Sequence, residues 1–375
     1  MSEAAGGVGR DYAVIDADGH VSETAEDLFP YLEPPFAGNQ QLRQRMAASL
    51  PALDGWNRLA TVVQLTQLRG VDHNAIIMNR PPAWLDAAAW LAFLDEAGIR
   101  RTVLYPSDLL TFGAVRGTVW AVALARAYNA YLHDRYTRRS DRLDGMALLP
   151  VQDGEEAARE LERAVRELGL RGGVLMVSGI RRPLGDRMYD PLYAVAQDLD
   201  VPLAVHAGGS DYLGFDRYFD KGEVEIKCLS HGVGQMIALV SLMMSGVFER
   251  FPRLRMAFLE AGAGWVPWLA QRMDAEWEAR GRLQAPETKR PPSEYLAQGN
   301  LFFNVEPDEL SAEFLALARA RLGRDDIFLY ASDLPHEPRH EIVAHLAELR
   351  ARTDLPAETK RAILCGAAQR YYRFA

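Results

Sequence analysis

The chain has 375 residues, 49% hydrophobic and 25% charged, which is the composition of an ordinary globular protein and excludes a disordered or collagen-like chain. Its formal net charge of −9 at pH 7 disfavours binding to the phosphate backbone of nucleic acids. The two cysteines, Cys228 and Cys365, lie far apart and argue against a disulfide framework or a zinc finger. No stretch is typical of a signal peptide or a membrane span, so we expect a cytoplasmic protein without a nucleic-acid or membrane partner.

Eight short apolar runs alternate with helical patterns along the chain. The runs that are typical of strands are residues 12–18, 101–106, 145–151, 173–177, 201–206, 254–260, 301–306 and 327–332. Helical spacing of apolar residues is found in residues 155–168, 189–199, 236–248, 311–322, 339–352 and 357–372. Apolar strands without polar alternation are typical of parallel strands that are buried on both faces. The pattern predicts the α/β class and favours a TIM (β/α)8 barrel over a doubly wound open sheet.

The segment 22–96, between the first and second predicted strands, interrupts this alternation. It contains several prolines together with Trp56, Trp84 and Trp90, and it is too long for a simple connection between a strand and a helix. We expect an inserted lid or small subdomain over the C-terminal mouth of the barrel, where active sites of this fold lie. Its tryptophans would line either the substrate pocket or a contact between subunits. Residues 1–375 are otherwise expected to form one domain.

Polar residues stand at the carboxyl ends of several predicted strands. Asp18 and His20 end the first strand, and because they are two residues apart their side chains point to the same side. His206 ends the fifth strand, Glu260 ends the sixth, and Asp333 follows the eighth. In a closed barrel these ends converge, and carboxylates gathered with imidazoles suit a divalent metal ion. Taken singly, each histidine is as readily a structural residue, and each aspartate a helix N-cap.

Four stretches carry a resemblance to a known family. They are IDADGHVSE (15–23), PLAVHAGG (202–209), SGVFERFPRLRMAFLEAGAGWVPWLAQRMD (245–274) and ASDLPHE (331–337). In these stretches the chain resembles the second amidohydrolase family, in the branch that includes aminocarboxymuconate-semialdehyde decarboxylase and the resorcylate-type decarboxylases. The resemblance extends from about residue 16 to residue 372. It implies a distorted TIM (β/α)8 barrel that binds one divalent metal ion.

The resemblance also implies the ligands of that ion, which are Asp18, His20, His206 and Asp333. The family has an H-x-H pattern at the end of the first strand, and here Asp18 takes the place of the first histidine, as a glutamate does in some decarboxylases of the family. The relatives with a carboxylate at this position resemble manganese enzymes. We therefore favour Mn²⁺, although Zn²⁺ and Fe²⁺ also bind a set of two imidazoles and two carboxylates.

A second departure from the family concerns the catalytic residues. Many members have a histidine at the end of the sixth strand, where this chain has Glu260. Glu260 is either a general base beside the metal ion or a supporting hydrogen-bond acceptor. His231, which we expect in a loop before helix 236–248, is the alternative replacement for that histidine, or else a surface residue. Asp333 is the third catalytic candidate, as a proton acceptor.

Three further residues are expected to support the site. His336 follows Asp333 in the S-D-x-P-H motif, and Trp265 follows the sixth strand, so both are candidates for substrate contacts. Glu23 lies three residues after His20 and is expected to orient that histidine.

These observations predict a mononuclear, metal-dependent enzyme that acts on a small aromatic or cyclic organic acid. We favour non-oxidative decarboxylation. The alternative reaction is hydrolysis of an amide, ester or lactone, and the second alternative is a barrel that binds a ligand without catalysis. By resemblance to the family, we also expect a homodimer or a larger homo-oligomer.

Overall fold

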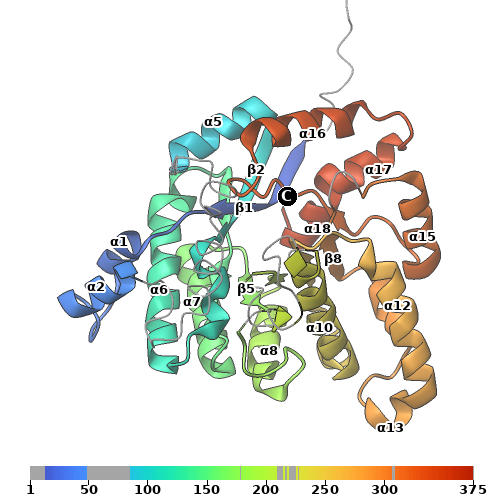
Figure 1. Ribbon diagram of the computed structural model, residues 1–375, viewed down its shortest axis with the longest axis horizontal. Coiled ribbons are helices and arrows are strands. Elements are labelled where there is room, and N and C mark those ends of the chain that lie inside the picture. Colours follow the sequence, from blue (N-terminus) through green and yellow to red (C-terminus); the bar gives the residue numbers. More distant parts are fainter. Residues whose placement is uncertain are drawn as a thin grey trace, which may run out of the picture.

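Parallel strands alternate with helices throughout the described part of the chain (Figure 1). The computed structural model describes residues 13–48, 85–177, 179–208, 214–215, 218, 225–226, 228–305 and 309–374. One sheet has the order β1 (Val14–Val21), β2 (Ile99–Pro106) and β3 (Leu143–Gly145). The second sheet has the order β4 (Ala147–Leu148), β5 (Gly173–Met176), β6 (Leu203–His206), β7 (Met256–Leu259), β8 (Leu301–Asn304) and β9 (Phe328–Leu329).

The two sheets meet at two seams. At the first seam the chain passes from β3 to β4 through Met146, whose N–H donates to the carbonyl of Leu104 on β2 at 3.0 Å. At the second seam the N–H of Ala17 donates to the carbonyl of Tyr330 at 3.0 Å, and the N–H of Asp333 donates to the carbonyl of Asp18 at 2.9 Å. The eight predicted strands are therefore all present, in a distorted (β/α)8 arrangement in which the third predicted strand is broken into β3 and β4.

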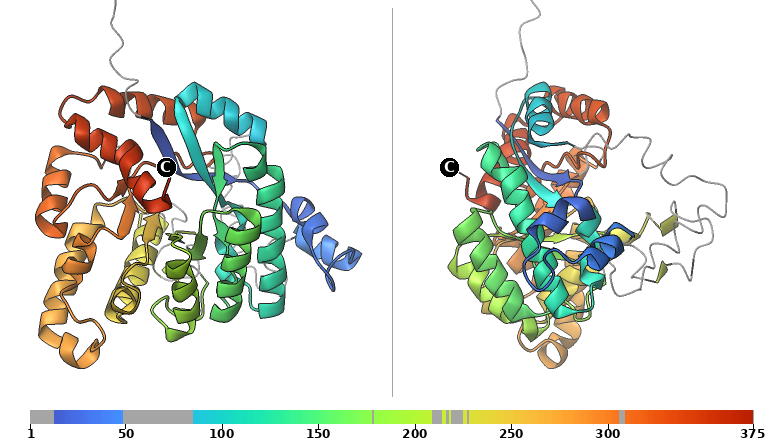
Figure 2. Two further views of the ribbon diagram at one scale, coloured as in Figure 1. Left: turned by 180° about the vertical axis from the view of Figure 1, so that it is seen from behind. Right: turned by 90° about the vertical axis from the view of Figure 1, so that its left-hand side faces the viewer.

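Helices lie on the outside of the strands in both views of Figure 2. Those that connect successive strands or extend the connections are α5 (Ala87–Ala97), α6 (Thr118–Arg135), α7 (Gly154–Leu168), α8 (Asp190–Asp198), α10 (Ser230–Met244), α11 (Val247–Arg250), α12 (Trp265–Glu276), α13 (Arg282–Gln284), α14 (Pro292–Ala297), α15 (Ala312–Leu322) and α16 (Arg339–Ala351). The chain ends with α17 (Ala357–Arg361) and α18 (Ala367–Tyr372). Strands β5, β6, β7 and β8 are buried along their whole length, as their apolar sequences predict, and β1 is also buried although it carries Asp16, Asp18 and His20.

The predicted insertion is only partly visible. Residues 49–84, with Trp56 and Trp84, lie outside the described residues, so the lid stays a prediction. The short helices α1 (Ala25–Leu28) and α2 (Gln40–Ala48) are described, and α1 packs against α6. The end of the segment is α5, which packs on β2 in the place of an ordinary crossover helix.

Trp90 corrects the expectation for the tryptophans of this segment. Its side chain is fully buried on α5, and a Cβ atom at Gly19 of β1 would lie 2.6 Å from its ring. Trp90 is therefore part of the core on the outer side of β1, and neither a pocket residue nor a subunit contact. The reason is that the glycine leaves room for an indole between the strand and the helix.

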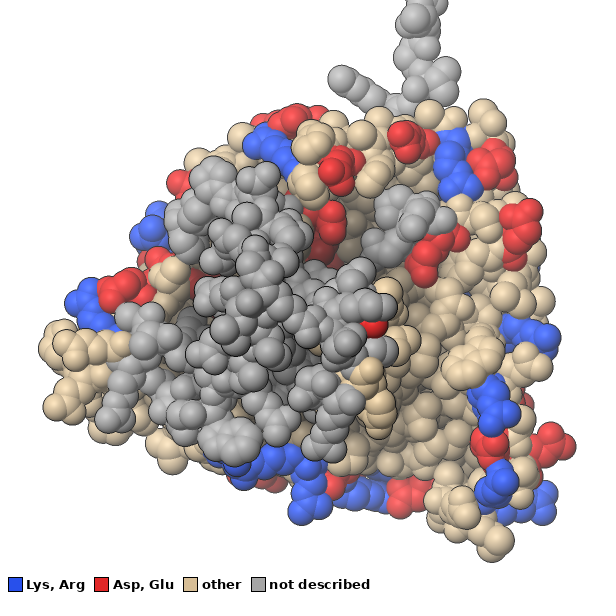
Figure 3. All heavy atoms as spheres, in the orientation of Figure 1, with Lys and Arg blue, Asp and Glu red and all other residues tan. Residues whose placement is uncertain are grey.

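Charged side chains are mixed on the surface. On the face shown in Figure 3, the described lysines and arginines are interspersed with acidic residues and form no continuous basic patch. Among the described helices, none combines the length and the apolar character that crossing a membrane requires.

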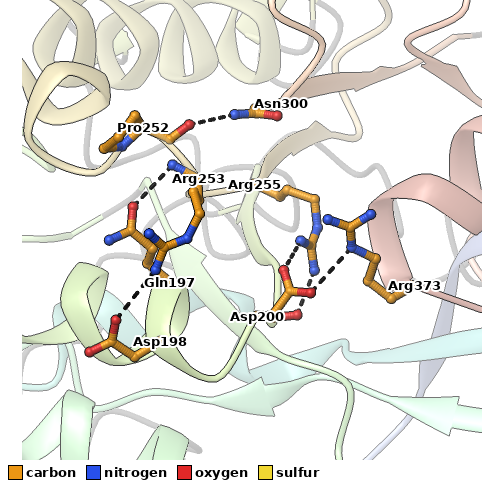
Figure 4. Close-up of a pocket in the computed structure, with 8 residues that line it drawn as sticks. All are labelled: Gln197, Asp198, Asp200, Pro252, Arg253, Arg255, Asn300 and Arg373. Atoms are coloured by element: carbon orange, nitrogen blue, oxygen red, sulfur yellow. Dashed lines mark hydrogen bonds and ion pairs between the residues drawn. The ribbon is translucent and has the colours of Figure 1, made fainter.

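The segments that lead into β6, β7 and β8 enclose a hollow of about 450 Å³ at the end of the barrel where these strands begin (Figure 4). Arg255 is 5% exposed there and donates to the carbonyls of Tyr371 at 3.0 Å and of Asp200 at 2.6 Å. Its guanidinium also pairs with the Asp200 carboxylate, which lies 3.4 Å from Nε of Arg373. Arg255 thus fastens the C-terminal helix α18 to the barrel, a role in stability that is typical of this end of the fold.

Replacing Arg255 should therefore destabilise the fold. Arg255→Ala removes hydrogen bonds from a buried cation to two carbonyls, and we expect it to lower the free energy of unfolding by about 2 kcal/mol. Urea unfolding measures this change. Arg253→Ala is the matched control, because Arg253 is largely exposed and its side chain pairs with the exposed carboxylate of Asp198. Equal losses in both variants would contradict the account of Arg255.

Candidate metal centre

The end of β1 directs two side chains into the barrel mouth. Gly19 faces the opposite side, where a Cβ would lie 2.6 Å from both the Trp90 ring and Oγ1 of Thr102. Its neighbours Asp18 and His20 face inward, and Nε2 of His20 lies 3.5 Å from Oδ1 of Asp18. The pairing of β1 with β2 shifts register between Asp16 and Gly19. The side chains of Asp18 and His20 nevertheless lie close together.

The other two predicted ligands reach the same point from distant parts of the chain. His206 ends β6, and its Nε2 lies 3.3 Å from Oδ2 of Asp18. Asp333 follows β9, and its Oδ1 lies 3.2 Å from Nε2 of His20. Asp18, His20 and His206 are buried, and their ligand atoms lie within 4.8 Å of one another. The ligand atoms of a second group, His20, Asp333 and His336, also lie within 4.8 Å of one another, and in that group only His20 is buried. The fold thus brings together all four residues that the sequence suggested as ligands.

Backbone carbonyls orient both histidines. Nδ1 of His20 lies 2.8 Å from the carbonyl of Pro106, and Nδ1 of His206 lies 2.6 Å from the carbonyl of Ala207. Because a carbonyl only accepts, each Nδ1 carries the proton and each Nε2 keeps its lone pair toward the cluster. Burial lowers the pKa of both rings, that of His206 to about 4, so both are neutral ligands at pH 7.

Several atoms that face the cluster have no hydrogen-bond partner. Within the described residues these buried atoms include Oδ1 of Asp18, Nε2 of His20 and Nε2 of His206. Buried polar atoms without a partner are rare in folded proteins. Burial raises the pKa of Asp18 well above its usual range; His20 opposes this rise, and Asp333 and Asp16 add to it. A divalent cation would satisfy these lone pairs and offset the negative charge, so the residues fit a metal ion.

Asp16 supports the ligands from behind, and the sequence analysis missed it. Its carboxylate accepts from Oγ1 of Thr102 at 2.6 Å, and from the N–H and Oγ of Ser332, both at 2.8 Å. It therefore ties β1 to β2 and to the chain that carries Asp333. The Asp-Ala-Asp spacing gave no signal of this role, because the register shift between Asp16 and Gly19 leaves the Asp16 carboxylate on the outer side of β1, where a Cβ at Gly19 would lie 3.1 Å from its Oδ2.

Glu260 lies beside the imidazoles. Its Oε2 is 3.4 Å from Nδ1 of His206, and its Oε1 is 4.0 Å from Nδ1 of His336. The backbone of Glu260 has φ of +58° and that of Asp333 has φ of +51°, a left-handed conformation that is unfavourable for residues other than glycine. Such strain is concentrated at functional sites. Both roles considered for Glu260, proton transfer and support, agree with this position.

His231 does not lie in a loop, so that expectation is wrong. It stands in the first turn of α10, which begins at Ser230, and neither group of candidate ligand atoms in the described chain includes it. The side-chain amide of Gln235 donates to the carbonyls of Val205 at 3.0 Å and of Leu259 at 2.8 Å. These bonds fix the start of the helix to β6 and β7, and tertiary contacts thereby override the low helix propensity of the nearby glycines.

His336 and Trp265, the two candidates for substrate contacts, both bond within the protein. Nδ1 of His336 lies 2.8 Å from Oδ1 of Asp333, and its Nε2 lies 2.9 Å from Oγ of Ser107, a residue that no sequence signal singled out. The indole N–H of Trp265 donates to the carbonyls of Ala261 at 3.2 Å and Gly262 at 3.0 Å, which closes the turn at the start of α12.

Glu23 holds the segment after β2. Its buried carboxylate accepts from the N–H of Ser107 at 3.1 Å and from that of Leu109 at 2.8 Å. In the described structure Glu23 shares no hydrogen bond with His20, whose orienting partner is the carbonyl of Pro106. The expectation that Glu23 orients this histidine directly is therefore corrected. The reason is that the chain turns after β1, and the carboxylate then faces the end of the neighbouring strand.

The left-handed backbone at Glu260 predicts that glycine is more stable than alanine at this position, which is the reverse of the usual order. Glu260→Gly and Glu260→Ala remove the same carboxylate, but alanine is disfavoured in the left-handed conformation by about 1–2 kcal/mol. We expect Glu260→Gly to be the more stable variant by about 1 kcal/mol in urea unfolding of the metal-free protein. At Leu259, in regular β-structure, alanine should instead be the more stable of the two. The same order at both positions would contradict the strain.

Comparisons with known proteins agree with this architecture. The gamma-resorcylate decarboxylase of Polaromonas sp. is 28% identical over 290 residues, which are 75% of this chain and 85% of that protein. Two solved structures share the fold. The 5-carboxyvanillate decarboxylase of Novosphingobium aromaticivorans, solved with manganese and 4-hydroxy-3-methoxy-5-nitrobenzoic acid, is 22% identical with a TM-score of 0.72 and covers 98% of each chain.

The second structure is the dihydroxybenzoic acid decarboxylase of Polaromonas sp., solved with manganese and 2-nitroresorcinol. It is 21% identical with a TM-score of 0.67, over 96% of this chain and 97% of that one. The sequence model of the family described as amidohydrolase matches residues 15–374. Because this match spans nearly the whole chain, the protein belongs to the amidohydrolase family.

Proposed function

We propose that this protein is a metal-dependent lyase that removes the carboxyl group from a small hydroxylated aromatic acid without an oxidant. The observation that carries the proposal is the buried cluster of Asp18, His20 and His206, whose inward atoms lack partners among the described residues. The similarity to resorcylate and carboxyvanillate decarboxylases supports the substrate class. The manganese in two of the similar structures supports Mn²⁺ as the ion.

Asp18, His20, His206 and Asp333 would hold the ion. When bound, it supplies positive charge that attracts and polarises the carboxylate or hydroxyl oxygens of the substrate. The chain contributes two neutral imidazoles and two carboxylates, and the two negative charges of the carboxylates cancel the charge of a bound divalent ion. The substrate anion would then meet neither a strongly positive nor a strongly negative site.

The reaction needs a proton at the ring carbon. The bond between that carbon and the carboxyl group breaks, its electron pair remains on the ring, and a proton takes the place of the departing CO₂. Glu260 and Asp333 are carboxyl groups at the mouth that can hold this proton. Because Glu260 lies beside His206 without being a candidate ligand, Glu260→Gln should separate proton transfer from metal binding. We expect this variant to keep its metal ion and lose turnover.

Two finer points also belong to this proposal. By family resemblance the protein would form a homodimer or a larger homo-oligomer, which light scattering of the purified chain measures. Its predicted cytoplasmic location rests on the sequence alone.

Metal content and CO₂ release together test the function. We expect the purified protein, stripped and then supplied with Mn²⁺, to bind about one equivalent and to release CO₂ from at least one member of a hydroxybenzoate panel. Asp18→Asn and His206→Ala should each reduce bound manganese and turnover by more than about 100-fold, since even residues that only support a ligand cost up to that much. His340→Ala is the control, because that imidazole is 85% exposed.

Other outcomes would identify a different function. Turnover of a lactone or an amide, with no CO₂ from any acid, would favour hydrolysis. A ligand that binds equally well to the wild type and to Asp18→Asn, without turnover, would favour a non-catalytic barrel.

A further inference from the structure

A directed chain of hydrogen bonds ends on the proposed ligand Asp333. Nδ1 of His336 lies 2.8 Å from Oδ1 of Asp333. Because a carboxylate oxygen accepts, Nδ1 carries the proton, and in the neutral ring the other nitrogen of His336 has a lone pair. That Nε2 lies 2.9 Å from Oγ of Ser107, so the serine hydroxyl is the donor. These hydrogen bonds thus run from Ser107, in the segment after β2, through the imidazole of His336 to Asp333, in the segment after β9.

Ser107 is held in place independently of His336. Its backbone N–H donates to the carboxylate of Glu23, which also accepts from the N–H of Leu109. Glu23 is fully buried, so its carboxylate has little freedom to move and holds this segment in place. The position of the Ser107 hydroxyl is therefore set by the main chain, and His336 has to align with it.

Asp333 is the ligand that most needs such alignment. Its side chain is 24% exposed, whereas those of Asp18, His20 and His206 are at most 1% exposed. Its backbone is also in the unfavourable left-handed conformation, so local propensity does not fix the direction of the side chain. The hydrogen bond from His336 supplies part of the restraint that burial supplies to the other three ligands.

We propose that Ser107 is a positioning residue, which acts through His336 to hold the carboxylate of Asp333 toward the metal ion. This inference rests on the proposed function, because it takes the metal site as given. The hydroxyl of Ser107 is linked to Asp333 by way of the imidazole of His336, so its effect on metal binding would pass through that ring. Residues that orient a ligand in this way typically change metal affinity by 10–100-fold when they are removed.

Manganese affinity of the full chain tests the proposal. The free Mn²⁺ signal in electron paramagnetic resonance gives the dissociation constant, and Ser107→Ala should raise it by about 10-fold or more. Ser107→Thr keeps a hydroxyl and should restore affinity close to that of the wild type. Thr111→Val is the matched control: it removes a hydroxyl from the same segment, where Oγ1 of Thr111 donates to the carbonyl of Asp108. It should leave the affinity unchanged.

A double-mutant cycle tests whether Ser107 acts through His336. If it does, Ser107→Ala combined with His336→Ala should bind Mn²⁺ no more weakly than His336→Ala alone. Additive losses would overturn the proposal, because they would mean that Ser107 reaches the site by another route. Thermal unfolding of each variant confirms that the comparison is made between folded proteins.

Histidine ¹⁵N resonances of the metal-free protein provide a second measurement. The Nε2 resonance of His336, assigned by its loss in His336→Ala, should move in Ser107→Ala and stay in place in Thr111→Val. An unchanged resonance in Ser107→Ala would overturn the proposal. A wild type that binds no Mn²⁺ refutes the proposed function and the role of Ser107 with it. A wild type that binds Mn²⁺ no better than Ser107→Ala refutes the role of Ser107 alone.

Discussion

A buried negative charge is the constraint on which the barrel mouth depends. Asp18 lies at the end of β1 with one carboxylate oxygen lacking a partner among the described residues, and burial raises the pKa of this carboxyl well above its usual range. Without a cation close to it such a group takes up a proton, so Asp18 is ionised only when a cation lies beside it. His20 and His206 do not supply that charge, because burial lowers the pKa of both rings and so keeps them neutral at pH 7. The buried carboxylate and the two neutral imidazoles therefore fit a bound divalent metal ion.

The rest of the fold serves to keep this charge in position. Gly19 lets the core indole of Trp90 approach the outer side of β1, which leaves Asp18 and His20 on the inner side. Asp16 then joins β1 to β2 and to the chain after β9 by hydrogen bonds, at the seam where the two sheets meet. The same seam carries Asp333, so the joining of the two sheets and the assembly of the candidate site depend on the same few contacts.

The features that could be predicted from the sequence are those that depend only on the order of the strands. The eight strands follow from their apolar runs, and the rule that strand ends converge at one mouth places residues such as His206 near the other strand ends, whereas the ligand set was implied by the family resemblance. The start of α10 at Ser230, which places His231 in a helix, could not be predicted, because it depends on how Gln235 bonds to two strands. The core position of Trp90 and the hydrogen bond of Ser107 could not be predicted for a similar reason: both depend on partners many residues away, and neither residue type carries a signal of its own.

Anomalous diffraction at the manganese edge tests the central claim most directly. A crystal of the protein supplied with Mn²⁺ should show one strong anomalous peak per chain, in contact with Asp18, His20, His206 and Asp333. A crystal with no peak at this position, or with manganese bound only elsewhere on the chain, would contradict the account. The buried carboxylate of Asp18 would then require another partner.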